Sequence, residues 1–208
     1  KICIIMIMKI EVRLMLIRAK TKTLFKGKTL TKIQQDNSDL NIKEMEEGKY
    51  TLSSFPRRLV LELTNMCNLN CIMCGRNSSS FNPTSFDMEI FHSLEPLFDV
   101  IEEVTLMGWG EPTIHPHFID MLKTINKHSA RKYFCTNGMT LDKIKDAIFD
   151  YNVDIIAVSV DGAKSSTNNL IRRGSDLAPV LDAFLKAEYA NGTINQLALK
   201  YGVGINTE

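Results

Sequence analysis

From residue 58 onward, short apolar segments alternate with segments whose apolar residues repeat at helical spacing. The strand-like segments cover residues 59–63, 104–107, 132–135, 154–160 and 197–203. The helix-like segments between them cover residues 87–97, 118–125, 141–148 and 177–189. Such alternation is typical of a parallel sheet whose strands are joined by crossover helices. The chain is therefore predicted to have an α/β fold.

Each of the first four predicted strands is followed by a loop of unusual composition. The loops hold, in order, three cysteines at 67–74, the run Gly108-Trp109-Gly110-Glu111-Pro112, the run Thr136-Asn137-Gly138, and the run Ser159-Val160-Asp161-Gly162. In parallel β/α folds the carboxyl ends of the strands lie on one face, where active sites are built. We therefore expect the four loops to meet at one pocket.

The first loop carries Cys67, Cys71 and Cys74 at CxxxCxxC spacing. A closed structural zinc site or an ordinary four-iron cluster uses four protein ligands. Three compact thiols therefore indicate a metal cluster with one coordination position left for chemistry. Two alternatives remain open: a zinc-binding interaction module with a histidine as fourth ligand, and an iron-sulfur electron-transfer protein whose fourth ligand lies elsewhere.

The second loop places glycines beside a carboxylate. Gly and Pro punctuate ordinary turns, so this segment could be a tight turn and nothing more. A backbone without side chains next to Glu111 would equally suit a ligand ammonium group.

Composition separates the amino-terminal part from the rest. Residues 1–32 carry nine Lys or Arg and one acidic residue, Glu11, whereas the whole chain has a net charge of +1. We interpret residues 1–56 as a basic, strand-like extension and residues 57–208 as the core domain. The near-neutral total indicates no nucleic-acid partner, and the apolar opening at 2–8 is too short to span a membrane. Five cysteines, three of them in a ligand pattern, fit a reducing cytoplasm.

Together the motifs resemble the radical S-adenosylmethionine (SAM) superfamily over roughly residues 57–203. The resemblance implies that the three cysteines hold three irons of a [4Fe-4S] cluster and that SAM chelates the fourth. Met73 stands where the family usually has an aromatic residue. The fold implied is a partial (β/α) TIM-like barrel, of which about five of the usual six strands are present. No cysteine follows Cys135, so we expect either that the auxiliary-cluster region of the relatives has been lost or that the sequence is truncated.

The resemblance also assigns the SAM-binding residues. By position, Gly108, Gly110 and Glu111 would bind the SAM ammonium group, and Asn137 would line the cofactor pocket. Ser159 and Asp161 would bind the ribose. Arg173 would bind the SAM carboxylate, with Arg172 as an equal rival.

The implied activity is reductive cleavage of SAM to a 5′-deoxyadenosyl radical that abstracts hydrogen from a substrate. An external donor such as flavodoxin or ferredoxin would supply the electron. By family analogy the substrate is a peptide or protein, or otherwise a small molecule. The motif set is similar to the branch that includes SPASM-type maturases and the molybdenum-cofactor cyclase.

Overall fold

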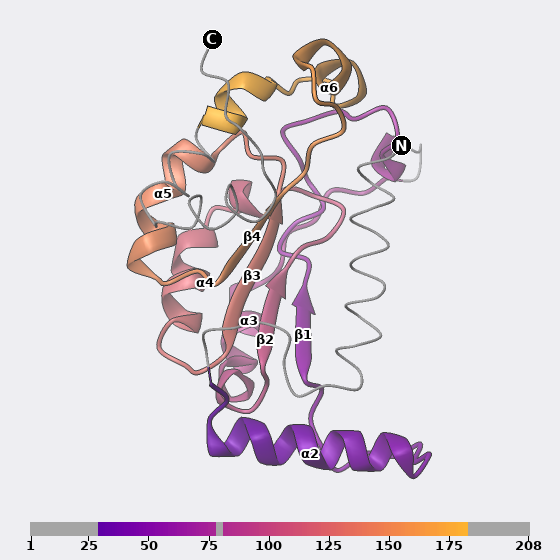
Figure 1. Ribbon diagram of the computed structural model, residues 1–208, viewed down its shortest axis with the longest axis vertical. Coiled ribbons are helices and arrows are strands. Elements are labelled where there is room, and N and C mark those ends of the chain that lie inside the picture. The colour runs from indigo at the N-terminus through magenta and orange to yellow at the C-terminus, as the bar shows by residue number, and fades with distance from the viewer. Residues whose placement is uncertain (1–28, 78–80, 183–208) are drawn as a thin grey trace, which may run out of the picture.

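The computed structural model describes residues 29–77 and 81–182. Within them, four parallel strands form one sheet in the order β1-β2-β3-β4. The strands are β1 (Arg58–Leu61), β2 (Glu103–Leu106), β3 (Arg131–Thr136) and β4 (Ile155–Val158). All four point the same way in Figure 1, so their carboxyl ends meet at the upper edge of the sheet. The α/β fold and the first four predicted strands are confirmed, with boundaries shifted by one or two residues.

The connecting helices lie against one face of this sheet (Figure 1). They are α3 (Met88–Ser93), α4 (Phe118–Ile125) and α5 (Leu141–Asp150), and α6 (Ser165–Ile171) follows β4. Short 3₁₀ turns cover Gly75–Asn77, Glu95–Asp99 and Pro112–Ile114. Burial of apolar side chains between the helices and the sheet forms the core, at about 2 kcal/mol for each large side chain.

Helix α4 shows how the sequence builds this core. Phe118, Met121, Leu122 and Ile125 are all fully buried, as their helical spacing predicts. The ring of Phe118 meets that of Phe134 on β3 edge-on, with the ring centroids 5.3 Å apart. The apolar stripe of α4 therefore fixes the helix on the sheet and sets the position of the loop that precedes it.

The helix that begins after Asp87 is shorter than predicted. Asp87 caps it as expected, accepting hydrogen bonds from the backbone N–H groups of Glu89 and Ile90. The helix ends at Ser93, however, and Pro96 lies in a separate 3₁₀ turn. Proline cannot donate the backbone hydrogen bond that would continue the helix. Within the helix, Phe91 is fully buried, whereas Ile90 is 54% exposed.

Helix α2 (Lys32–Glu46) is a correction to the strand-like description of the amino-terminal extension. A capping box starts it, in which Thr31 and Gln34 exchange side-chain and backbone hydrogen bonds. Its buried residues are Gln34, Asn37, Ser38, Asn41 and Glu44, all polar. A search for apolar repeats overlooks a helix of this kind, because its inward face carries no apolar stripe.

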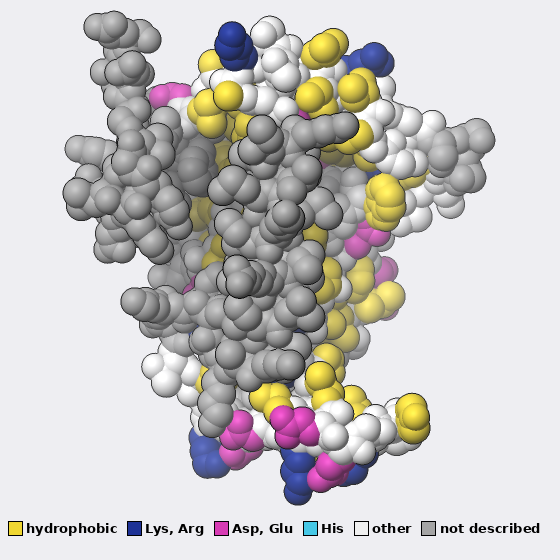
Figure 2. Space-filling view, turned by 45° about the vertical axis from the view of Figure 1, so that its right-hand side comes forward, with side chains coloured by type: hydrophobic (Ala, Val, Ile, Leu, Met, Phe, Trp, Pro, Cys, Tyr) yellow, Lys and Arg dark blue, Asp and Glu magenta, His cyan; other side chains and the backbone are white. Residues whose placement is uncertain are grey.

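The polar face of α2 packs beneath the sheet, at the end opposite the strand tips (Figure 1). Gln34 donates a hydrogen bond to the backbone oxygen of Ile101 at 2.8 Å. Glu44 accepts from the backbone N–H groups of Ser53 and Ser54, and the first of these bonds is the main reason that the pKa of Glu44 falls to about 2. The outer surface of α2 carries apolar side chains among charged ones (Figure 2).

Some predictions fall outside the described residues. These are the strand at 197–203, most of the helix at 177–189 and the apolar opening at 2–8; residues 177–182 are helical as predicted. The division at residue 56 stays a prediction. In the described part of the chain, no helix combines the length and apolar character needed to cross a membrane.

Candidate cofactor site

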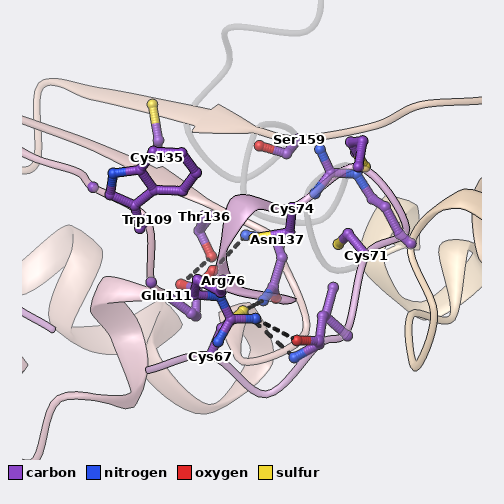
Figure 3. Close-up of a pocket in the computed structure, with 15 residues that line it drawn as sticks. Cys67, Cys71, Cys74, Arg76, Trp109, Glu111, Cys135, Thr136, Asn137 and Ser159 are labelled. Atoms are coloured by element: carbon purple, nitrogen blue, oxygen red, sulfur yellow. Dashed lines mark hydrogen bonds between the residues drawn. The ribbon is translucent and has the colours of Figure 1, made fainter. Parts of the chain in front are cut away.

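A cavity of roughly 210 Å³ lies at the carboxyl ends of the strands. All three cysteines of the triplet line it, together with Gly108, Gly110, Glu111, Asn137 and Ser159. Figure 3 shows these side chains arranged around one space. Residues from four separate loops therefore share one cavity, which is the arrangement expected from parallel strands.

The cysteine loop is held by backbone hydrogen bonds to the segment that follows α6. The N–H of Asn70 donates to the backbone oxygen of Arg173, and that of Ile72 donates to Ile171, both at 2.9 Å. Arg76 adds a bond from Nη2 to the backbone oxygen of Leu69 at 2.6 Å. The middle of the loop, between Cys67 and Cys74, is thereby held in place.

The environment of the thiols combines burial with N–H donors. The Sγ of Cys67 accepts from the backbone N–H of Leu69 at 3.4 Å and from Nδ2 of Asn137 at 3.6 Å. Burial raises the pKa of the Cys71 thiol. All three cysteines are free thiols. Among the described residues, no three His, Cys, Asp or Glu side chains lie close enough to hold a single metal ion.

These residues fit an iron-sulfur cluster. Three soft thiol ligands face a cavity with space beside them, and N–H donors already point at one sulfur, as in the outer shell of a cluster. The sulfur atoms do not meet at the close distance that a single zinc ion requires. The three sulfurs therefore share one cavity without forming a site for a single metal ion.

Glu111 is buried, and its carboxylate joins two of the loops. Oε1 accepts from the N–H and the hydroxyl of Thr113 and from the hydroxyl of Thr136. Oε2 accepts one bond, from the N–H of Asn137 at 2.6 Å. Oε2 thus accepts fewer bonds than Oε1 and keeps spare acceptor capacity, and Glu111 is one of the residues that line the cavity.

Gly110 is required by close backbone contact. A Cβ atom there would lie 2.1 Å from the backbone oxygen of Thr64 and 2.3 Å from that of Met66. The neighbouring N–H of Glu111 donates to Met66 at 2.8 Å. Only glycine allows this loop to lie directly against the start of the cysteine loop.

The remaining residues assigned by resemblance separate into two groups. Asn137 lies between the loops, with Nδ2 donating to Asn68 Oδ1 at 2.7 Å, and Ser159 lies on the cavity wall. Asp161 is not part of the wall: its carboxylate forms an ion pair with Arg172 Nε at 2.6 Å. Arg172 lines the cavity whereas Arg173 does not, so of the two rivals the structure favours Arg172.

Several further cavity residues were missed as site residues, among them three with polar or ionisable side chains. Arg76, Thr136 and Cys135 all line the cavity. Thr136 could have been found as part of the Thr-Asn-Gly run, and Cys135 as the residue that ends an alternating strand. Nothing in the sequence marks Arg76 except its position two residues after Cys74, the third cysteine of the triplet.

Comparisons with known proteins agree with this geometry. The radical SAM superfamily model matches residues 61–197. A tungsten-containing aldehyde ferredoxin oxidoreductase cofactor-modifying protein of Pyrococcus furiosus is 30% identical over 126 residues, covering 59% of this chain and 35% of that protein. Mycofactocin maturase MftC of Mycobacterium ulcerans is 26% identical over 160 residues, covering 72% of this chain and 42% of that protein. GTP 3′,8-cyclase of Alkaliphilus metalliredigens is 26% identical over 134 residues, covering 61% and 42%.

The fold is shared with the peptide-bound crystal structure of SuiB from Streptococcus suis. That likeness has a TM-score of 0.51 at 17% identity and covers 89% of this chain and 42% of that one. The partial-barrel prediction is thereby confirmed. The chain spans less than half the length of the curated relatives named above. With a family match over most of its length, the chain belongs to the radical SAM superfamily, whose enzymes use a [4Fe-4S] cluster and SAM.

Proposed function

We propose that this protein reductively cleaves SAM and uses the resulting radical to abstract hydrogen from a substrate. The observation that carries the proposal is the single cavity lined by the cysteine triplet and by the loops at Gly110, Asn137 and Ser159. When bound, the cluster and SAM would supply the chemistry for reductive cleavage and radical formation. The contribution of the protein is to bind, orient and shield the cofactors.

Particular residues would divide this work. Cys67, Cys71 and Cys74 would ligate the cluster. Oε2 of Glu111 would accept a hydrogen bond from the SAM ammonium group, beside a backbone that Gly110 keeps free of side chains. Asn137 and Ser159 would line the pocket.

The two charged residues near α6 would have different tasks. Arg172 on the cavity wall is the better placed of the two arginines to face the SAM carboxylate. Asp161 would hold the Arg172 side chain through their ion pair. Arg173 would act through its backbone oxygen, which holds the cysteine loop.

The substrate and the redox partner follow by analogy. The relatives include a maturase and a cyclase, so a peptide or protein, or a small molecule, is proposed as substrate. We expect a flavodoxin or ferredoxin as electron donor. A reducing cytoplasm would keep the thiols available as ligands.

Cluster content and SAM binding after anaerobic reconstitution with iron and sulfide test the proposal. The wild-type chain should hold one oxygen-sensitive four-iron cluster whose spectrum changes when SAM is added. Changing Cys67, Cys71 and Cys74 to Ala should abolish it, whereas Cys135→Ala should not. Wild-type iron content in the triple variant would overturn the assignment.

Two results would favour the two other classes of protein that the cysteine triplet leaves open. Tight zinc binding without iron uptake would indicate a zinc-binding interaction module. A stable cluster that does not respond to SAM would indicate an electron carrier.

A further inference from the structure

A second cavity, of roughly 300 Å³, lies beside the cofactor cavity. The two cavities share Trp109 and Arg76. The second is also lined by Glu62, Asn65, Gly75, Phe81 and Asn82. It follows the end of β1 and contains none of the cysteines.

Glu62 brings an unpaired carboxylate into this cavity. Its Oε1 accepts a hydrogen bond from the backbone N–H of Trp109. Oε2 forms no hydrogen bond with the described residues, and no Lys, Arg or His among them forms an ion pair with it. The side chain is exposed. One carboxylate oxygen is therefore held in place by the loop while the other is available to a ligand.

The other polar groups of the cavity are largely committed elsewhere. Nη2 of Arg76 donates to the backbone oxygen of Leu69, and the Arg76 guanidinium lies over the ring of Phe81, 5.8 Å from its centroid. Both atoms of the Asn65 side-chain amide are hydrogen-bonded: Nδ2 donates to the backbone oxygen of Asn82, and Oδ1 accepts from the N–H of Thr84. Arg76 is the positive group of the cavity wall, and Glu62 is the acidic group, with one exposed oxygen, that a cationic ligand in the second cavity would meet.

Trp109 supplies an aromatic wall. Its six-membered ring packs directly on Gly75, where a Cβ atom would lie 2.5 Å from Cζ3. The indole is nevertheless 63% exposed, and it borders both cavities. The face of an indole ring attracts ammonium and guanidinium groups, more strongly when a carboxylate lies nearby.

We propose that the second cavity is a substrate subsite that takes a cationic group, held by Glu62 Oε2 against Trp109. The inference rests on the proposed function, because the shared wall would bring a substrate bound there next to the site of radical formation. The ligand chemistry is an ammonium or guanidinium group. It belongs either to a basic side chain of a peptide or to a small amine.

Emission from Trp109, the only tryptophan of the chain, provides the measurement. The reconstituted full chain is titrated with the blocked tripeptide acetyl-Ala-Lys-Ala-amide, with its norleucine analogue, and with n-butylammonium. We expect saturable emission changes with the lysine peptide or n-butylammonium, and none with the norleucine peptide. Tighter binding of the lysine peptide would identify a peptide source, and binding of n-butylammonium alone would identify a small amine. Equal responses to the lysine and norleucine peptides would overturn the proposal.

Glu62→Gln separates charge from structure, because its amide oxygen can still accept the Trp109 hydrogen bond. Affinity for the cationic probe should fall at least about tenfold, as expected when a charge-assisted hydrogen bond is lost. The matched control is Glu46→Gln on the exposed side of α2, which should change nothing. Cluster content and SAM binding, measured on the same samples, should stay at wild-type values. Unchanged cation affinity in Glu62→Gln would reject the subsite alone. Absence of SAM binding by the wild-type protein would instead reject the proposed function.

Discussion

Glu111 holds two active-site loops together through its side chain. Its carboxylate accepts two hydrogen bonds from Thr113, which follows it in its own loop, and two from Thr136 and Asn137 after β3. A buried carboxylate with this many donors is well satisfied. A residue assigned to SAM by resemblance is therefore also a structural link between β2 and β3.

Glu111→Gln should destabilise the protein as well as weaken SAM binding. An amide offers one acceptor oxygen, so its NH₂ group would face at least one of the present donors. We expect the free energy of unfolding to fall by about 1–3 kcal/mol, the usual cost of a buried polar group left without a partner. Urea unfolding of the cofactor-free protein measures this loss. Glu89→Gln on exposed α3 is the control, and equal stability of Glu111→Gln and wild type would contradict the structural role.

Single residues show where sequence reasoning succeeds and where it stops. Gly110 was identifiable from its place beside Glu111 in a recognisable motif, and the structure adds the reason that the position needs glycine, which is close backbone contact. Arg172 and Arg173 were not separable, because the direction of each side chain depends on where α6 ends, at Ile171. The unpaired state of Glu62 depends on the tertiary packing of the loop at Gly108, which no local pattern reports.

At the scale of elements, apolar periodicity correctly predicted the helices and strands that pack through apolar side chains. The four described strands and helices α4 and α5 belong to this class, because their buried faces form the core. Helix α2 does not, since it is held by polar groups such as Gln34 and Glu44. The predicted helix at 87–97 is in fact two elements, α3 and the 3₁₀ turn Glu95–Asp99. The apolar spacing continues past Pro96, but the helix ends before it.

A pH-sensitive contact ties the end of α4 to the 3₁₀ turn Glu95–Asp99. His128 Nδ1 lies 2.8 Å from Asp99 and Nε2 lies 3.2 Å from Glu95. Burial would lower the pKa of His128, but these hydrogen bonds outweigh it and raise the pKa. The same bonds lower the pKa of Glu95, and in Asp99 they outweigh the opposing effect of burial.

The stabilisation from His128 should therefore be full below its unfolded pKa, about 6.5, and should disappear as pH rises through the higher folded value. The lowered pKa values of Glu95 and Asp99 preserve the contact in mild acid. We expect the stability advantage of wild type over His128→Gln, less than about 1 kcal/mol for this partly exposed contact, to shrink between pH 6 and 8.5. Urea unfolding at several pH values tests this, with exposed His117→Gln as control. A difference that does not vary with pH would refute it.

At the scale of the whole molecule, the two ends of the sheet serve different purposes. The carboxyl ends carry the cavity, with polar residues and glycines in the loops. The amino end is covered by α2, which is fastened by contacts of Glu102 with Ser38 and with Arg57. This separation is typical of β/α folds, in which one end of the strands provides chemistry and the other stability.

Glu102→Ala should release α2 without affecting the cofactor site. The Glu102 and Arg57 side chains are 14% and 15% exposed, and Nε of Arg57 lies 2.6 Å from the carboxylate, so the change removes a mostly buried ion pair together with the acceptor of the Ser38 hydroxyl. We expect the backbone amides of α2 to exchange with solvent at least about tenfold faster, corresponding to about 1.4 kcal/mol. Hydrogen exchange resolved by mass spectrometry would measure this, with iron content after reconstitution recorded in parallel. Because the carboxylate lies at the opposite end of the sheet from the cysteines, iron content should not change. If iron retention fell together with α2 protection, the extension and the core would have to be treated as one cooperative unit instead of two parts.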